Sequence, residues 1–254
     1  MTPIRRLMVW VTVFLVAVTV MLAATAPAAL PASMIEIATA GRLKMVSSSG
    51  SAWHGDGLLM TAAPSALSTE QLAVHWTTDF SSMYRGELVV HIDLGAQSLR
   101  ITATPSRWSI DSAGARLPMA FLRPFFPRLV ANSSWTGEVR LAATGFGQTW
   151  VGSEGAGSAR LEVKSLAVAE FSATPLGSYQ LDLKPDTHFT SLALTTLAGP
   201  LKLEGGGRAG SAGMSCEIRA ELAQEASDEL GKILNHVARR EAGRVWSVVC
   251  PGHA

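Results

Sequence analysis

The chain has 254 residues, a formal net charge of +1 and only 16% charged residues. A balance so close to neutral gives no support to nucleic acid or to a strongly acidic partner. The charged fraction lies below the quarter that is usual in soluble proteins, which indicates an apolar segment and a main domain rich in small residues.

The N-terminal segment has the pattern of a membrane anchor. Arg5 and Arg6 precede residues 7–30, which carry no charge. About twenty residues at roughly 1.5 Å each span a bilayer core, and flanking arginines stay on the cytoplasmic side. We therefore predict a cytoplasmic stub and transmembrane anchor over residues 1–32, with everything after Pro31 on the far side, which is the periplasm of a Gram-negative cell. The anchor residues are Leu7, Trp10, Phe14, Leu15, Leu22 and Leu30.

A cleaved signal peptide is the alternative, since Ala26-Pro27-Ala28 offers a small-residue cleavage site. The apolar stretch is longer than the 7–15 residues of a usual signal core, which favours an uncleaved anchor. Both interpretations export the main domain.

A short motif occurs twice after this segment. Gly50-x-x-Trp53-x-Gly55 reappears as Gly147-x-x-Trp150-x-Gly152, and the strand-like stretches after the first copy have counterparts after the second. We predict a duplicated unit, with one copy in residues 33–130 and the other in residues 131–254. Glycines permit close backbone approach, and a tryptophan supplies a large apolar anchor. The tryptophans are predicted to plug the ends of the sheet, and the alternative is that they line a groove for a partner strand or a lipid chain.

Most of the main domain reads as half-buried antiparallel strands, because apolar and polar residues alternate. The alternating runs are 87–94, 99–103, 108–110, 139–143, 161–164, 179–184, 201–204, 215–222 and 245–250. Four glycine clusters, at 55–57, 145–147, 155–157 and 205–207, are interpreted as turns. The predicted fold is a curved antiparallel β-sheet domain with short helices.

Two segments have helical character. Residues 117–130 are apolar but interrupted by Pro118, Pro124 and Pro127, which indicates a broken helix or a connector. Residues 227–240 carry apolar side chains at helical spacing, and Arg239 and Arg240 are predicted to lie in the last turn, with Gly243 ending the helix.

Cys216 and Cys250 are the only cysteines, and each is in phase with the apolar face of a predicted strand. An exported protein can keep a disulfide, so the two pair if their strands are neighbours. The alternative is that both are small buried apolar residues.

No catalytic or cofactor motif occurs in the chain. The sequence contains no nucleophile elbow, phosphate loop, zinc-protease motif or C-x-x-C pair. His54, Asp56 and His75 lack metal-ligand spacing. We therefore expect no catalytic residue, no cofactor and no metal.

With the anchor and repeats placed, the chain resembles type II secretion system protein N. The resemblance depends on the order of the Arg-bearing start, the apolar span, Ser49–Gly55, Leu72–Trp76, Pro175–Tyr179 and Gly199–Gly205. It implies a non-enzymatic accessory subunit, single-pass in the inner membrane, whose periplasmic β domain assembles with inner-membrane platform and secretin-linked subunits.

A second hypothesis is a periplasmic lipid-binding or lipid-transfer module. A curved sheet with one apolar concave face can hold acyl chains if helices do not close it. The residues predicted to line that groove are Leu88, Val90, Ile92, Leu161, Val163, Leu181 and Leu183.

Overall fold

The fold was analysed in a computed structural model of the chain. It describes residues 25–61, 71–95, 97–121, 135–151, 154–168, 175–210, 213–224 and 238–250, together with positions 10–12, 14, 15, 17, 18, 21, 231, 234 and 235.

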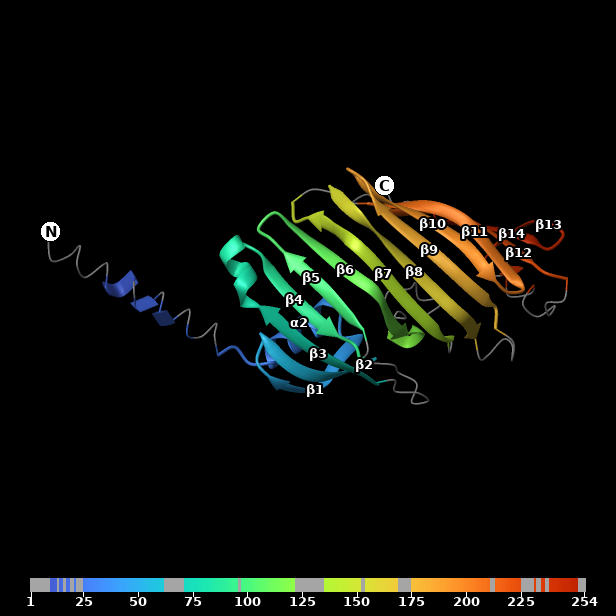
Figure 1. Ribbon diagram of the computed structural model, residues 1–254. Coiled ribbons are helices and arrows are strands. Elements are labelled where there is room, and N and C mark those ends of the chain that lie inside the picture. The colour runs from blue at the N-terminus through green and yellow to red at the C-terminus, as the bar shows by residue number, and fades with distance from the viewer. Residues whose placement is uncertain are drawn as a thin grey trace.

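One antiparallel sheet dominates the molecule, which confirms the predicted mainly β class (Figure 1). It has 14 strands that pair in chain order up to β12, after which the order is β14 and then β13. The first strands are β1 (Leu43–Gly50), β2 (His54–Thr61), β3 (Gln71–Asp79), β4 (Leu88–Asp93), β5 (Ser98–Ala103), β6 (Arg107–Pro118) and β7 (Trp135–Thr149). The others are β8 (Gly155–Val168), β9 (Gly177–Pro185), β10 (Phe189–Ala198), β11 (Leu201–Gly210), β12 (Gly213–Leu222), β13 (Arg239–Ala242) and β14 (Val245–Cys250).

Few helices accompany the sheet among the residues that the structure describes. Helix α2 (Ala29–Ala38) packs beside β1, the 3-10 helix η1 (Phe80–Arg85) connects β3 to β4, and the short η2 (Met119–Phe121) follows β6. Asp79 caps η1 because its Oδ1 accepts a hydrogen bond from the Ser81 N–H at 2.9 Å.

The strand register joins the apolar side chains into one continuous face. From β4 to β6 the pairs Val90–Ile101 and Ile101–Ile110 lie directly opposite each other. From β8 to β12 the same holds for Leu161, Leu181, Leu194, Gly205 and Ile218. Period two then places the charged residues on the other face, so the predicted alternation continues across the sheet.

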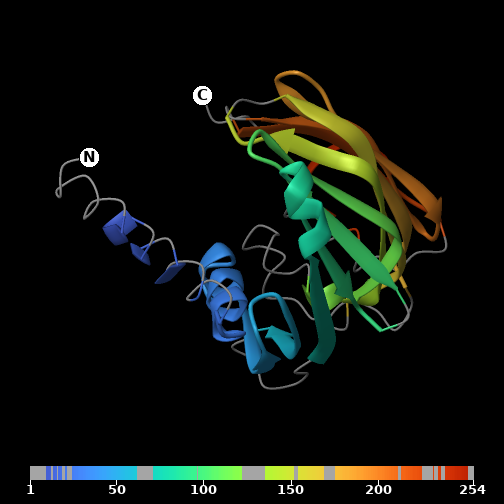
Figure 2. The ribbon, with the colours of Figure 1, turned by 60° about the vertical axis from the view of Figure 1, so that its left-hand side comes forward.

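The sheet curls into a trough (Figure 2). Its ends, β1 and β13, are not neighbours in the strand order, so the sheet stays open. Apolar side chains in the middle of the face are half-buried, whereas their charged neighbours on the same strands are exposed, as in the regular alternation of β11 and β12. Side chains converge on the inside of a curve, so the apolar face is the inner one.

Part of this inner face is sealed by the chain itself, and we refer to it as the covered stripe. Met119 of η2 packs against Val139 and Tyr179, and Leu234 packs against Leu222 and Trp246. All these side chains are at least nine-tenths buried. The covered stripe comprises Val139, Leu166, Val168, Tyr179, Leu201, Ala220, Leu222 and Trp246.

A second part of the inner face is the open stripe, which comprises Leu88, Val90, Ile92, Leu99, Ile101, Ile110, Leu183 and Leu192. These side chains are half-buried and belong to neither buried cluster. Among the residues that the structure describes, no second layer packs on them.

The four glycine clusters lie within strands, so their interpretation as turns was wrong. Residues 55–57 belong to β2, 145–147 to β7, 155–157 to β8 and 205–207 to β11. A Cβ on Gly207 would lie 2.5 Å from the Ser215 carbonyl oxygen, and one on Gly205 would overlap the Glu217 carbonyl oxygen. These glycines therefore permit close strand approach where the sheet bends.

The two predicted helical segments are also revised. Leu117 and Pro118 end β6, a 3-10 turn occupies 119–121, and residues 122–130 lie outside the described part. In the second segment Gly231, Leu234 and Asn235 are helical as predicted. Arg239 and Arg240, however, form β13 rather than a last helical turn, and Gly243 lies in the β13–β14 turn with φ +55°. Strand pairing with β14 is preferred to a helix for these two residues. The Arg240 guanidinium over the Trp246 ring adds a further contact that favours the strand.

The duplicated unit is only partly visible in the strand order. Counterpart stretches lie in β3 and β8, in β4 and β9, and in β5 and β10, a constant shift of five strands, but the motif copies lie at the β1–β2 and β7–β8 hairpins, a shift of six. The predicted boundary after residue 130 falls between β6 and β7, which pair along their length. The two-unit division stays a prediction.

In the predicted anchor, Trp10, Phe14, Leu15 and Leu30 are exposed, and Leu7 and Leu22 lie outside the described residues. Within the described part of the chain, no helix has the length and apolar character needed to cross a bilayer.

Candidate functional site

The first copy of the repeated motif forms the β1–β2 hairpin. Gly50 and Gly55 are register partners, and a Cβ on Gly55 would lie 2.6 Å from the Trp76 ring. Trp53 is half-buried, contacts the Phe80 ring at 5.5 Å between centroids, and its carbonyl accepts the Thr78 N–H at 2.7 Å. This copy therefore fastens the hairpin to β3 and η1.

The second copy lies at the β7–β8 hairpin and is not equivalent. Trp150 is 56% exposed, so it is not the buried plug that the sequence suggested. Its indole N–H donates to the Thr104 carbonyl at 2.6 Å, and its backbone N–H donates to Ser106. Gly147 lies against the backbone of Trp108 and Ser109, and Gly152 is outside the described residues. The Trp150 ring therefore connects the β7–β8 hairpin to the β5–β6 connection at the rim of the sheet and does not fill a core.

The outer edge of β1 is an exposed edge of the sheet. Helix α2 runs beside β1 in the opposite direction, and at the N-terminal end of β1 the Thr39 Oγ1 accepts the Leu43 N–H and Lys44 pairs with Glu36 at 3.3 Å. At the other end, Pro27 bridges to Ser51. Between these ties the five residues 46–50 are exposed, including Val46 at 64%.

The alternation of hydrogen bonds along β1 identifies which groups point outward. The Ser51 N–H donates to the His54 carbonyl, so Ser49 and Asp56 form the next hydrogen-bonded pair. Ser48 therefore directs its own N–H and C=O away from β2. The opposite edge, β13, is four residues long and contains Arg239, Arg240 and Glu241, which is the usual protection of a sheet edge.

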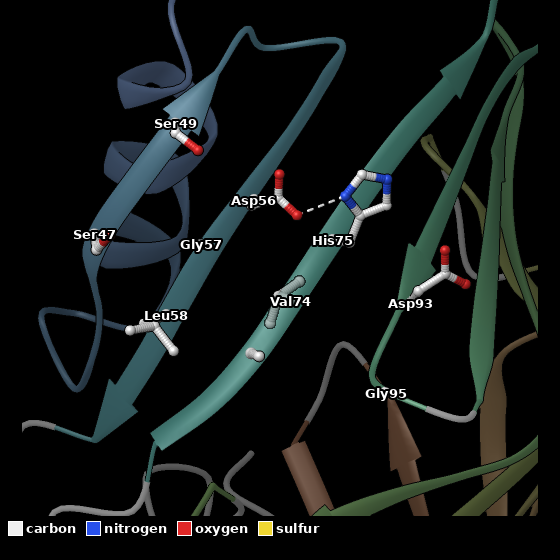
Figure 3. Close-up of a pocket in the computed structure, with 10 residues that line it drawn as sticks. Ser47, Ser49, Asp56, Gly57, Leu58, Val74, His75, Asp93 and Gly95 are labelled. Carbon is white, nitrogen blue, oxygen red and sulfur yellow. Dashed lines mark hydrogen bonds and ion pairs between the residues drawn. The ribbon is translucent and has the colours of Figure 1, made fainter.

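A polar pocket of about 400 Å³ lies on the outer face of β1–β4 (Figure 3). Register places Ser49, Asp56, His75 and Asp93 in one row across the four strands. His75 Nδ1 and Asp56 Oδ1 are 2.8 Å apart, and His75 Nε2 is 3.2 Å from Thr77 Oγ1.

This row has the order of a carboxylate, imidazole and hydroxyl relay, but not the surroundings of one. The Asp56 and His75 side chains are 72% and 47% exposed, so water reaches both. Acyl transfer needs donors for the oxyanion in a site that excludes water. An exposed pair on the outer face of a sheet is instead a cross-strand contact that holds β2 to β3.

A metal is not supported at this place. His54 bonds Ser51 through Nδ1 at 3.2 Å and does not join Asp56 and His75. Among the residues that the structure describes, no group of three His, Cys, Asp or Glu side chains is placed to hold an ion.

Two ionisable groups show what the faces do to charge. On the outer face, Arg160 donates to Asp182 at 2.7 Å and lowers the pKa of that carboxyl below its ordinary 3.8. On the inner face, burial raises the pKa of the Tyr179 phenol well above its ordinary 10.0, and its hydroxyl contacts the Leu176 and Leu201 carbonyl oxygens. The ionised form of Asp182 is therefore stabilised on the outer face, whereas the ionised form of Tyr179 is disfavoured on the inner face.

Cys216 is disulfide-bonded. Strands β12 and β14 are neighbours, and the register sets Cys216 opposite Cys250, the other cysteine of the chain. Directly opposite residues of an antiparallel pair have the Cα separation that a disulfide requires.

These features define the class of protein: an open, twisted antiparallel sheet with a polar outer face, an apolar inner face and one free edge. The chain belongs to the type II secretion system protein N family, whose model matches residues 41–249, and is an accessory component of type II secretion. Comparison with curated proteins and with solved structures found no match.

Sequence reasoning missed the free edge, and it considered Asp56 and His75 only as metal ligands and not as a cross-strand pair. Residues 43–50 contain serines and glycine and no alternation, so nothing local marks them as a strand. Asp56 and His75 meet only because β2 and β3 pair in one register. The alternation of Leu72, Val74 and Trp76 was the available signal for β3.

Proposed function

We propose that this protein is a non-enzymatic subunit of the type II secretion system that joins other subunits through the free edge of β1. The inner-membrane anchor at residues 7–30 holds the β-sheet domain in the periplasm, where inner-membrane platform and secretin-linked subunits are within reach. The family match supports the secretion assignment.

The observation that carries the mode of assembly is the contrast between the two sheet edges. β13 is short and charged, whereas residues 46–50 of β1 carry no charge and are exposed. An unprotected edge accepts an extended segment of a partner by adding a strand. The outward N–H and C=O of Ser48 supply a backbone pairing point.

The test is a pull-down of the tagged full-length protein from its native envelope, comparing Ser48→Pro with Ser48→Ala. Proline removes the outward donor and is tolerated on an edge strand, whereas alanine keeps the backbone donor. We expect Ser48→Pro to lose the secretion subunits that the wild type and Ser48→Ala retain, with unchanged thermal melting. Equal recovery with all three proteins would exclude the β1 edge as the assembly surface.

Topology is tested separately with alkaline phosphatase, which is active only outside the cytoplasm. Fusion at Arg5 should be silent and fusion after His253 active. An inactive His253 fusion would overturn the periplasmic placement.

A further inference from the structure

We propose that the open stripe of the trough binds the acyl chains of phospholipid. This inference does not depend on the role in secretion, because it comes from the inner face and not from the β1 edge.

The first argument is the chemistry of the inner face. From β3 to β12, the positions that share this face include no Asp, Glu, Lys, Arg or His. Few polar side chains share this face, and two of its hydroxyls are engaged: Ser112 donates to the Leu141 carbonyl and Thr196 donates to the Leu203 carbonyl. An occupant therefore finds mainly apolar contact and few hydrogen-bond partners.

That chemistry selects among occupants. An extended peptide would bury N–H and C=O groups without partners, each at a cost of about 1–3 kcal/mol. A hydrocarbon chain has no such groups and gains about 0.8 kcal/mol for each CH₂ that leaves water. Gly205 and Gly207 continue the rows of Leu194 and Leu192 without side chains, which leaves the face hollowed there.

The second argument is the rim beside the open stripe. The β3–β4 and β5–β6 connections and the β7–β8 hairpin lie at one end of their strands, opposite to the end that η2 covers. This rim exposes large apolar side chains that a soluble surface would not gather: Phe80 at 51%, Met83 at 50%, Tyr84 at 96%, Trp150 at 56% and Val151 at 94%.

Tryptophan and tyrosine combine an apolar ring with a polar tip, as the water–lipid boundary favours. Exposed apolar side chains gathered along one edge indicate a surface that meets a partner or a membrane. The rim and the stripe together therefore fit a lipid source, with chains passing from the rim into the trough.

The experiment places a photoreactive amino acid in the full-length protein in cells grown with ³²P-phosphate. Ile101 faces the open stripe and Arg100 is its neighbour on the outer face; Leu192 and Ser191 form a second matched pair. We expect light-dependent ³²P adducts at Ile101 and Leu192, identified as phospholipid by mass spectrometry, and none at Arg100 or Ser191.

A blocking variant completes the test. Leu192→Glu introduces a charge into the stripe and should abolish the adduct at Ile101, whereas Ser191→Glu should leave it. Thermal melting checks that both variants fold. Adducts of equal strength on both faces, no phospholipid adduct at Ile101, or crosslinks at Ile101 to protein alone would each overturn the proposal.

Discussion

The covered stripe and the open stripe are both apolar and lie on the same sheet face, yet they differ in what packs on top of them. Trp246 in the covered stripe is 2% exposed, because Leu222 and Leu234 pack around it and its Nε1 donates to Asn235 at 2.7 Å. Leu192 and Ile101 in the open stripe are only half-buried. Burial therefore depends on the segments that return over the face and not on strand alternation.

The comparison also separates stability from function. A fully buried side chain contributes to folding and is unavailable to a ligand, whereas a half-buried one keeps apolar area that a ligand can still cover. The covered stripe is consequently expected to hold the fold, and the open stripe to be free for binding.

The largest effect should come from Trp246→Ala. Truncating a buried tryptophan removes its packing and leaves a cavity, which costs about 3–5 kcal/mol. Denaturant unfolding of the full-length protein in detergent measures this. A loss below about 1 kcal/mol would mean that the covered stripe is not the core.

The next largest loss of stability should come from removing the disulfide of Cys216. We predict that Cys216 is linked to Cys250, which adds a covalent link between β12 and β14. For a loop of this length, removing a disulfide costs about 3–4 kcal/mol. Cys216→Ser should unfold at lower denaturant, and reductant should shift the wild type but not the variant. A wild type that is insensitive to reductant would contradict the link.

A smaller effect is expected within the open stripe. Leu192→Ala should cost about 1–2 kcal/mol, less than the 2–5 kcal/mol of a fully buried leucine, because solvent already reaches the side chain. Leu222→Ala in the covered stripe, at 3% exposure, is the matched control. Equal losses at Leu192 and Leu222 would show that the open stripe is sealed in solution.

The smallest effect lies on the outer face. The folded pKa of Asp182 is below its ordinary 3.8, because Arg160 donates to it. A lowered folded pKa stabilises the protein above the ordinary value, and that contribution is lost as pH falls from about 5 to about 3. Asp182→Asn should make the melting temperature depend less on pH between about 5 and about 3. The effect should be slight, because the pair is exposed and screened by solvent. A melting temperature that depends more steeply on pH in the variant than in the wild type would show that ionised Asp182 does not stabilise the folded protein.

Alternation in the amino-acid sequence predicted many of the strands, although not β1 or β13. Runs such as 87–94 and 215–222 are strands, because period two with one apolar face is stable only on a pleated sheet. The order of short motifs also led to the secretion family, which the match over residues 41–249 shows.

Tertiary structure alone decided which edges, pairs and stripes matter. Arg239 and Arg240 follow a stretch with helical spacing of apolar residues, yet they form β13 because they can pair with β14. Trp53 and Trp150 stand in the same motif, yet one is half-buried against Phe80 and the other is exposed at a rim. Local sequence sets the period of side chains, but the register and the segments that return over a face set which of them water can reach.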